Sequence, residues 1–322
     1  MKVLVIQQRM GIGDMVIFLS YIHAIAKKEN CSVSILVKEN SRADEFLNQD
    51  KHIDKIILLD RKRNDAGKHS GILGFFKLAK ELKKEKYEKV YIFNSSLRYA
   101  LLAKFAHIKN IIQYPLFKKR GQNVIQAAKK FTEEIVGNNV SSQPIIFVSE
   151  KMISEAKTKY AFSKEFKHIC VGLSASGLTK RWDIDRFIST FEKISKDRPC
   201  KFYLAGGIND STLLNKFINS SLGKNSVSFE KMSIRETLPI ISNCNLYVGN
   251  DTGWLHLSCA LGLKCVALFM DSPVLAYGKY SNKISVVVPD GETEETTTHN
   301  TRGKDKITVE QVVQQTKQLL IN

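Results

Sequence analysis

The feature that most limits the possible folds of this chain is the alternation of short apolar runs with amphipathic helical segments. A predicted strand at 2–8, with its apolar run at 3–6, precedes a segment at 14–28 whose apolar residues recur three and four positions apart, as on one face of a helix. A second series starts with an apolar run at 168–173 and a helical segment at 184–196. Strands that alternate with helices favour parallel sheets covered on both faces. We therefore predict an α/β protein of two doubly wound, Rossmann-like domains that face a cleft, with ligands at the carboxyl ends of the strands.

Composition narrows the class of protein further. The 322 residues, 43% of them hydrophobic, are enough to bury the cores of two domains. The six cysteines form no CxxC pair and have no histidine at metal-ligand spacing, which is typical of buried thiols in a reducing compartment. The N-terminus lacks a signal-peptide pattern, and the longest apolar helical segment, at 15–26, is too short to span a bilayer. These features predict a soluble cytoplasmic protein.

The net charge of +17 is concentrated in one part of the chain. The window 61–130 holds 18 Lys and Arg residues against four Asp and Glu residues. Such a basic region attracts polyanions over long distances, and nucleic acid, an anionic membrane face and a phosphorylated glycolipid all fit that description. The alternative is that many of these residues, notably the lysines at 80–89, only form the solvated faces of helices.

The most specific motif is VGNDTGWLHLSCALG at 248–262. An apolar run ends in a polar turn, and an amphipathic helix then begins near Thr252, a good N-cap residue. Free N–H groups and the positive end of the helix dipole make such a turn a binding place for anions. The alternative is an ordinary capped helix. The residues predicted to hold a phosphorylated, hydroxyl-rich ligand are Asp251, Thr252, Gly253 and His256.

The first predicted strand is followed by GIGD at 11–14. A dinucleotide-binding fingerprint would need glycine or alanine at position 16, which is Val16, and an acidic residue at the end of the second strand. A carboxylate at the helix entrance would also repel a pyrophosphate. We therefore predict that Asp14 faces a neutral or proton-bearing group, and its alternative role is the N-cap of the following helix.

The segment SASGLTKRW at 174–182 follows another predicted strand. Hydroxyl groups, backbone N–H groups and a lysine are what a diphosphate needs, although the segment is not a Walker loop. The following Asp183 and Asp185 mimic a DxD metal motif. Because Asp183 is well placed to cap the next helix and nearby cations already supply positive charge, we predict no metal site there.

A glycine pair at 206–207 is followed by Asp210, again beyond a predicted strand. A carboxylate in this position can accept hydrogen bonds from ribose hydroxyls. Its alternative role is also that of a helix cap.

Together these segments resemble glycosyltransferase family 9, the ADP-heptose:lipopolysaccharide heptosyltransferases. The similarity runs in order through GIGD, SASGLTKRW, the glycine pair with its aspartate, the EKMS segment at 230–233 and NDTGWLH, and it covers most of the chain. It implies a GT-B fold with an N-terminal acceptor-binding domain (1–160) and a nucleotide-sugar donor-binding domain (161–306). A C-terminal helix (307–322) is expected to pack back toward the first domain.

The resemblance also implies a role for each matching residue. Asp14 falls on the general base of the family. Among the donor-binding positions, Ser176 and Lys180 match binders of the diphosphate, Asp210 matches a ribose-binding carboxylate, and Met232 lies beside the adenine. The motif that grips the donor phosphate and sugar comprises Asp251, Thr252, Gly253 and His256. The acceptor-binding candidates are Arg61, Lys62 and Arg63, with Arg98 and Arg120 in addition.

The implied reaction is the inverting transfer of a heptose, or a related sugar, from ADP-heptose to a lipopolysaccharide core acceptor. The acceptor hydroxyl attacks the anomeric carbon opposite the leaving ADP, and Asp14 takes the proton as the bond forms. Lys180, Ser176 and the helix end at Thr252 offset the charge of the departing diphosphate, so we expect no metal and no cofactor. The expected partners are the nucleotide-sugar donor and an anionic glycolipid at the inner membrane face, where peripheral attachment is a further expectation.

Three alternatives stay open at this point. A transferase of the same family could use another nucleotide sugar or another glycan acceptor. A nicotinamide-dependent oxidoreductase is a different class, against which Val16 in the broken fingerprint argues. A nucleic-acid-binding protein is favoured by charge alone, since the basic window shows little aromatic interleaving and no recognition motif. We predict no nucleic-acid partner.

Overall fold

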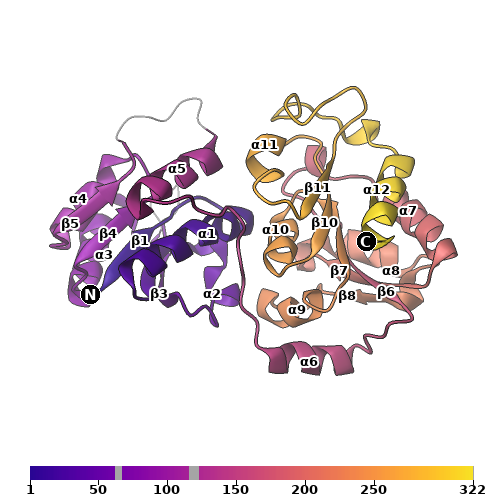
Figure 1. The fold of residues 1–322 in the computed structure, drawn as a ribbon, viewed down its shortest axis with the longest axis horizontal. Coiled ribbons are helices and arrows are strands. Elements are labelled where there is room, and N and C mark those ends of the chain that lie inside the picture. Colours follow the sequence, from indigo (N-terminus) through magenta and orange to yellow (C-terminus); the bar gives the residue numbers. More distant parts are fainter. Residues whose placement is uncertain (62–66, 116–122, 322) are drawn as a thin grey trace. The chain divides into compact units, whose positions relative to one another are not determined.

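The structure is a computed structural model that describes residues 1–61, 67–115 and 123–321. It divides into two compact units, Met1–Pro144 (unit 1) and Ile145–Asn322 (unit 2), shown in Figure 1. Each unit is a parallel sheet with helices on both faces, so the predicted fold class of two doubly wound α/β domains is confirmed.

Unit 1 contains a five-stranded parallel sheet in the order β3-β2-β1-β4-β5. Its central strand reads VLVI and is buried along its whole length, which suits β-branched side chains. The strands are β1 (Val3–Ile6), β2 (Val33–Lys38), β3 (Ile53–Leu59), β4 (Lys89–Ile92) and β5 (Asn110–Gln113). The helices are α1 (Ile12–Glu29), α2 (Ala43–Phe46), α3 (Gly71–Glu85), α4 (Leu97–Phe105) and α5 (Val124–Val136).

The side chains of alternate residues of β1 point to opposite faces of this sheet. Leu4 and Ile6 belong to a core that includes Leu78 and Leu82 of α3 and Leu102 of α4. The helix pair α3 and α4 therefore covers one face of the sheet, and these two helices also pack against each other, as α1 and α5 do.

Unit 2 contains a six-stranded parallel sheet in the order β11-β10-β9-β6-β7-β8. One face is covered by α7, α8 and α12, whose apolar side chains form a single core with Trp182. The strands are β6 (Lys167–Gly172), β7 (Cys200–Ala205), β8 (Ser226–Ser228), β9 (Leu246–Asn250), β10 (Lys264–Leu268) and β11 (Ile284–Val287). The helices are α6 (Glu150–Lys159), α7 (Ile184–Asp197), α8 (Ser211–Ile218), α9 (Ile234–Ile241), α10 (Gly253–Ala260), α11 (Val274–Tyr277) and α12 (Val309–Ile321).

Each sheet has one point where the strand order changes direction. It lies between β1 and β4 in unit 1 and between β6 and β9 in unit 2. Loops that leave two such strands turn to opposite sides of the sheet, and ligands of doubly wound proteins bind at their carboxyl ends. The loops after these four strands are therefore the first place to look for a site.

The division into units differs from the predicted domain boundary at residue 160. The second unit begins at Ile145, and α6 belongs to it. The reason is local packing, because Asn243 Nδ2 donates to the carbonyl of Ile153 in α6 at 2.9 Å. At the other end of the chain α12 packs on α7, and Trp182 Nε1 donates to the carbonyl of Ile307 at 3.1 Å. The return of this helix toward unit 1 stays a prediction.

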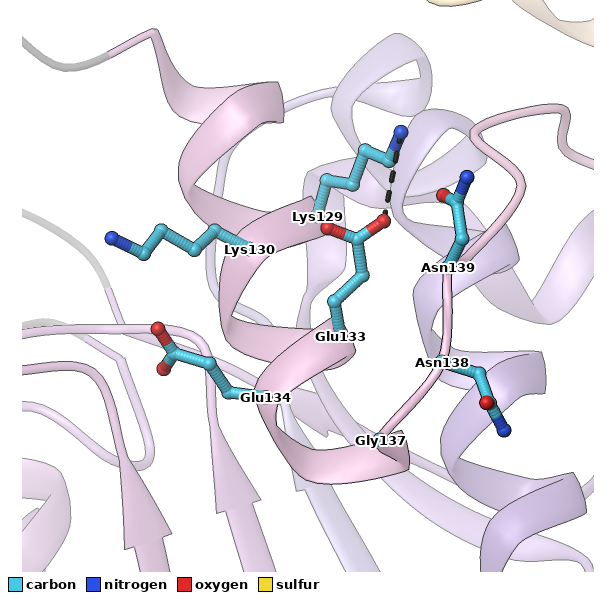
Figure 2. Close-up of a pocket in the computed structure, with 7 residues that line it drawn as sticks. All are labelled: Lys129, Lys130, Glu133, Glu134, Gly137, Asn138 and Asn139. Carbon is cyan, nitrogen blue, oxygen red and sulfur yellow. Dashed lines mark ion pairs between the residues drawn. The ribbon is translucent and has the colours of Figure 1, made fainter.

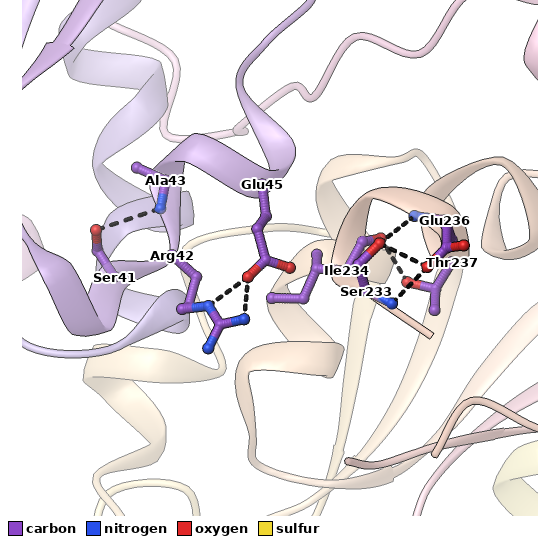
Figure 3. Close-up of polar contacts among 8 residues, drawn as sticks. All are labelled: Ser41, Arg42, Ala43, Glu45, Ser233, Ile234, Glu236 and Thr237. Atoms are coloured by element: carbon purple, nitrogen blue, oxygen red, sulfur yellow. Dashed lines mark hydrogen bonds and ion pairs between the residues drawn. The ribbon is translucent and has the colours of Figure 1, made fainter. Parts of the chain in front are cut away.

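Figure 3 shows the polar contacts at two helix starts, one in each unit. At the start of α2, Arg42 has a left-handed backbone and forms an ion pair with Glu45 one turn later. At the start of α9, Ser233 N donates to Glu236 Oε2 at 2.7 Å, and Glu236 N donates to Ser233 Oγ at 3.3 Å. This capping box fixes the turn after β8, which carries Met232.

The cysteines and helices agree with the compositional predictions in two respects. All six cysteines are free, and all are buried except Cys31, which is partly exposed. Burial raises the pKa of Cys170 to about 12 and that of Cys200 to about 11, so these thiols are protonated and unreactive. Among the described residues, no helix combines the length and the apolar character that crossing a membrane requires.

Candidate functional site

Asp14 lies in the first turn of α1, at the carboxyl edge of the unit 1 sheet. The helix begins at Ile12, and its N-cap is Gly11 with φ of +95°, a conformation that favours glycine. The alternative role of Asp14 as the N-cap is therefore wrong, because Asp14 is the third residue of the helix. Arg9 Nε donates to Asp14 Oδ1 at 2.9 Å, and the Asp14 side chain is 14% exposed. The carboxylate is thus held in one direction while part of it stays accessible.

The loop that supports this carboxylate is braced by the end of β1. Gln7 is fully buried, and its Oε1 accepts a hydrogen bond from Arg9 N at 3.1 Å. The next residue, Gln8, accepts a hydrogen bond from the hydroxyl of Tyr99 in α4. Polar side chains from α4 and from the loop after β1 therefore meet at the point where the strand order changes.

The acceptor-binding candidates are placed only in part. Arg61 is exposed. Burial raises the pKa of the Tyr99 hydroxyl, and the charge and side-chain hydrogen bond of Arg61 lower it only in part. Arg98 donates to the carbonyls of His69 and Gly71 at 3.4 Å each, and its guanidinium stacks 5.1 Å from the Phe75 ring. Arg98 therefore holds the start of α3. Three candidates lie outside the described residues, namely Lys62, Arg63 and Arg120.

In unit 2 the buried side chain of Asn250 ties the two central loops together. Its Nδ2 donates to the carbonyl of Leu173, just beyond β6, at 2.9 Å. Its Oδ1 accepts from Trp182 N at 3.1 Å. Both ends of the predicted diphosphate loop at 174–182 are therefore fixed to the last residue of β9. The strands can approach this closely because Gly172 and Gly249 are paired, and a Cβ on Gly249 would lie 2.6 Å from the Gly172 backbone.

Asp251 and His256 form a buried polar chain next to that loop. His256 Nε2 lies 3.4 Å from Asp251 Oδ1, and His256 Nδ1 lies 2.8 Å from the Tyr280 hydroxyl. Ser272 Oγ donates to Asp251 Oδ2 at 2.6 Å. Burial alone would raise the pKa of Asp251, but the contacts with His256 and Ser272 and the charge of Lys180 hold it below its usual value. His256 is 3% exposed, so its ring acts on Asp251 rather than facing solvent.

The predicted N-cap at the start of α10 is confirmed. Thr252 Oγ1 accepts from Trp254 N at 3.1 Å, and Gly253 is the first helical residue. Lys180 closes the short 3₁₀ helix Leu178–Lys180 after β6, and its charge also helps to lower the pKa of Asp271, which follows β10. The loop hydroxyl of Ser176 is exposed. A cation, a helix N-terminus and an exposed hydroxyl therefore belong to loops at one edge of this sheet.

Asp210 and Arg181 form a second polar pair in unit 2. Asp210 Oδ2 accepts from Gly207 N at 3.1 Å, which closes the turn after β7, and Oδ1 lies 3.8 Å from a terminal nitrogen of Arg181. Asp210 therefore closes its own turn instead of capping α8 with its side chain. The Nε of Arg181 is buried and has no hydrogen-bond partner among the described residues. Such a donor costs about 1–3 kcal/mol when unsatisfied, and a ligand oxygen would satisfy it.

Apolar side chains border the same edge near β8. Met232 is half-buried in the turn before α9, and its N donates to the carbonyl of Phe229 at 2.9 Å. The half-buried Trp254 ring lies 6.2 Å from the ring of Phe229. These side chains offer an apolar surface of the kind that a nucleotide base needs.

The aspartates of the DxD segment have structural partners. Asp183 Oδ1 accepts from Asp185 N at 2.8 Å and from Arg186 N at 3.4 Å, so the predicted helix cap is confirmed. Asp185 pairs with Lys216 at 2.7 Å. In the described part of the chain, no group of three His, Cys, Asp or Glu side chains is arranged to hold a metal ion.

A shallow depression of 720 Å³ lies elsewhere in unit 1, at the C-terminal end of α5 (Figure 2). Lys129 and Glu133 form an ion pair on its rim at 3.6 Å. None of the predicted site residues lines it. The residues around it are Lys129, Lys130, Glu133, Glu134, Gly137, Asn138 and Asn139.

Sequence reasoning missed several residues of these clusters. Asn250 belongs to the NDTG motif, so its position beside the site could be predicted from the sequence, but its hydrogen-bond partners could not. Asp271 and Ser272 follow an apolar run, which is the same signal that identified the other loops. Tyr280 comes from a segment without a recognisable pattern.

Two doubly wound parallel α/β units form the GT-B architecture, and the fold matches that of a solved heptosyltransferase structure. The profile of glycosyltransferase family 9 (heptosyltransferase) matches residues 75–307, and the chain belongs to this family. The predicted family and enzyme class are therefore confirmed.

Three solved structures share the fold. E. coli ADP-heptose LPS heptosyltransferase II is 20% identical, with a TM-score of 0.74 over 100% of this chain and 99% of that one. A family 9 glycosyltransferase from Veillonella parvula is 19% identical, with a TM-score of 0.81 over 99% and 97%. E. coli heptosyltransferase WaaC with ADP is 13% identical, with a TM-score of 0.70 over 99% and 100%. No curated protein matches the sequence significantly.

Proposed function

We propose that this protein transfers a heptose, or a related sugar, from ADP-heptose to a lipopolysaccharide core acceptor, with inversion and without a metal. The observation that carries the proposal is the cluster at the β6–β9 edge, where Asn250 fixes the loop of Ser176 and Lys180 beside Asp251 and the α10 N-terminus. The similar WaaC structures with ADP and with ADP-2-deoxy-2-fluoro heptose support an ADP-sugar donor.

In this proposal the donor binds to unit 2. Lys180, the Ser176 hydroxyl and the N–H groups at Gly253 take the diphosphate, because charge-assisted hydrogen bonds to phosphate are strong. Asp251, held by His256, accepts a hydrogen bond from a sugar hydroxyl. The adenine lies against Met232 and the nearby aromatic ring of Trp254, and Asp210 accepts from the ribose. The orphaned Nε of Arg181 beside Asp210 gains a ligand oxygen as its partner.

The acceptor binds to unit 1, where Asp14 is the general base. Its carboxylate takes the proton of the attacking hydroxyl while the oxygen forms a bond to the anomeric carbon, and the bond to the ADP oxygen breaks on the opposite face. Negative charge that develops on the diphosphate is offset by Lys180 and the α10 dipole. Arg61 contributes to binding the anionic acceptor, and the protein works at the inner membrane face.

The direct test is a nucleotide screen in which the melting temperature of unit 2 alone is measured. The two tryptophans of the chain, Trp182 and Trp254, both lie in unit 2, so intrinsic fluorescence reports the unfolding of that unit. ADP should raise its melting temperature, since a ligand at about 100 times its Kd stabilises the native state by roughly 2.7 kcal/mol. UDP, GDP, dTDP, NAD and NADP should give smaller shifts at the same concentration.

The outcomes separate the alternatives. A larger shift with UDP, GDP or dTDP would assign another nucleotide sugar as the donor. A larger shift with NAD or NADP would revive the oxidoreductase. Turnover that is lost with EDTA and restored by magnesium or manganese would contradict the metal-independent mechanism.

A further inference from the structure

Unit 1 carries a continuous row of exposed apolar side chains on the first helix after β4. Leu97, Leu101 and Phe105 stand four residues apart on α4, so they share one face of the helix. They are 48%, 39% and 50% exposed. Apolar side chains at this spacing normally face a core, yet here the core is formed by other residues of the same helix, such as Leu102.

The neighbouring helix extends this row into a patch. Ile72 and Leu73 in the first turn of α3 are 76% and 87% exposed, and Phe76 is 48% exposed. The Phe105 ring lies edge-on to Phe76 at 5.3 Å and to Phe75 at 5.7 Å, which joins the two helices. The α3–α4 patch consists of Ile72, Leu73, Phe76, Leu97, Leu101 and Phe105. Contiguous exposed apolar surfaces of this kind mark interaction sites.

The border of the patch is positively charged. Lys77, Lys80 and Lys84 are exposed on α3 and form no ion pair within the part of the chain that the structure describes. The two acidic residues of the same helix are neutralised, because Glu81 pairs with Lys68 at 2.8 Å and Glu85 pairs with Lys55 at 2.6 Å. The surface therefore combines apolar side chains with uncompensated cations.

We propose that the α3–α4 patch docks the protein on a membrane that contains anionic lipids. The apolar side chains enter the boundary between headgroups and acyl chains, and the lysines contact the headgroup phosphates. A second copy of the chain fits this surface less well, since a twofold interface brings the same lysines of both copies together. Charge complementarity therefore favours an anionic lipid surface as the occupant.

The position of the patch fits the proposed function, and the role of the patch in acceptor binding rests on that function. Helices α3 and α4 follow β3 and β4, so both begin at the carboxyl edge of the sheet, where Asp14 lies. Ile72, Leu73 and Leu97 occupy their first turns. A membrane in contact with the patch would hold a lipid-anchored acceptor near that edge.

The test is cosedimentation of the full chain with vesicles of phosphatidylcholine, alone or mixed equally with phosphatidylglycerol. The parent should bind the anionic vesicles more tightly, and the binding should weaken as salt is raised. The triple variant Ile72→Ser, Leu73→Ser, Leu101→Ser should lose partitioning by on the order of 10- to 100-fold. The matched control replaces Ile145 and Ile321, exposed apolar residues of unit 2, by Ser and should bind like the parent.

A charge variant completes the experiment. Replacing Lys77, Lys80 and Lys84 by Gln should lower binding to anionic vesicles on the order of 100-fold and leave binding to phosphatidylcholine unchanged. Circular dichroism, which reports both units, shows whether each variant is folded.

Three results would overturn the proposal. The first is equal vesicle binding by the parent and the patch variant, and the second is absence of binding by the parent. The third is a dimeric parent that the patch substitutions convert to a monomer, which would assign the patch to a second copy. The vesicles carry no sugar, so each of these results leaves the proposed reaction standing, and failure of the nucleotide screen leaves vesicle binding unaffected.

Discussion

Replacing Asn250 by Ala should destabilise unit 2 and weaken donor binding together. The side chain is fully buried, and its two shorter hydrogen bonds hold the carbonyl of Leu173 at 2.9 Å and the N–H of Trp182 at 3.1 Å. Alanine leaves both groups without a partner in a buried place. An unsatisfied buried group costs about 1–3 kcal/mol, so with two such groups we expect unit 2 to lose about 2–6 kcal/mol of unfolding free energy.

The same substitution releases the loop that carries Ser176 and Lys180. A loop that must be reordered on binding costs affinity, and we expect the Kd for ADP to rise by about tenfold, or roughly 1.4 kcal/mol. The matched control is Asn245→Ala, at the opposite end of β9. Asn245 is exposed, and its Oδ1 accepts only from His168 N at 2.8 Å among the hydrogen bonds of the described chain, so water can replace it. Its loss should cost about 0.5–1.5 kcal/mol and leave ADP affinity unchanged.

The assay is urea unfolding followed by tryptophan fluorescence, with ADP titration of the native proteins. Both tryptophans report unit 2, so unfolding of unit 1 does not enter the measurement. If Asn250→Ala and Asn245→Ala bind ADP within about threefold of each other, the loop does not depend on this contact and the reasoning is refuted.

Three further predictions concern charges. Lys180→Ala should weaken ADP binding by about 10- to 100-fold. The control is Lys264→Ala, which removes an exposed lysine at the opposite end of β10 and should leave ADP binding unchanged. Equal ADP affinities of the two variants in calorimetry would show that Lys180 does not bind the diphosphate. Asp251 has a lowered pKa, so its stabilising contribution is full above the unfolded pKa of about 3.9 and is lost as pH falls through the folded value. The stability difference between the parent and Asp251→Asn in urea unfolding should therefore shrink only below about pH 4, and a difference that already shrinks near pH 6 would be inconsistent. Arg61→Ala should raise the KM for an anionic acceptor at low salt and leave the KM for the donor unchanged, and parental acceptor kinetics would assign Arg61 to a solvated surface.

The order of strands and helices was largely predictable because most elements have a buried face and hence a regular apolar spacing. Two elements of unit 1 were missed. β5 is a four-residue edge strand without a buried residue, so it has little pattern. α5 starts with two β-branched residues, which have low helix propensity. The signals that could have found α5 are its ends, because Asn123 caps it and Gly137 ends it with φ of +78°.

The candidate site was predictable as a set of loops but not as a set of contacts. Glycines and polar residues after apolar runs identified the loops, since parallel strands bring their carboxyl ends to one edge. Spacing along the chain does not show which side chain braces another. The pairing of Asp251 with Ser272 and the chain from His256 to Tyr280 join residues about 20 positions apart, and only the folded sheet brings them together. The position of Asp14 was also not predictable from spacing along the chain. The turn at Gly11 starts α1 at Ile12, so Asp14 lies inside the helix and not at its cap.

The central claim is that the base acts from unit 1 while the donor is held by unit 2, and Asp14→Asn tests it most directly. Asparagine keeps the size of the side chain but cannot take a proton. Transfer from ADP-heptose to a lipopolysaccharide core acceptor should fall by about 10²–10⁴-fold, while the Kd for ADP stays at the parental value. A variant that retains more than about a tenth of the parental rate would contradict the assignment of Asp14 as the base.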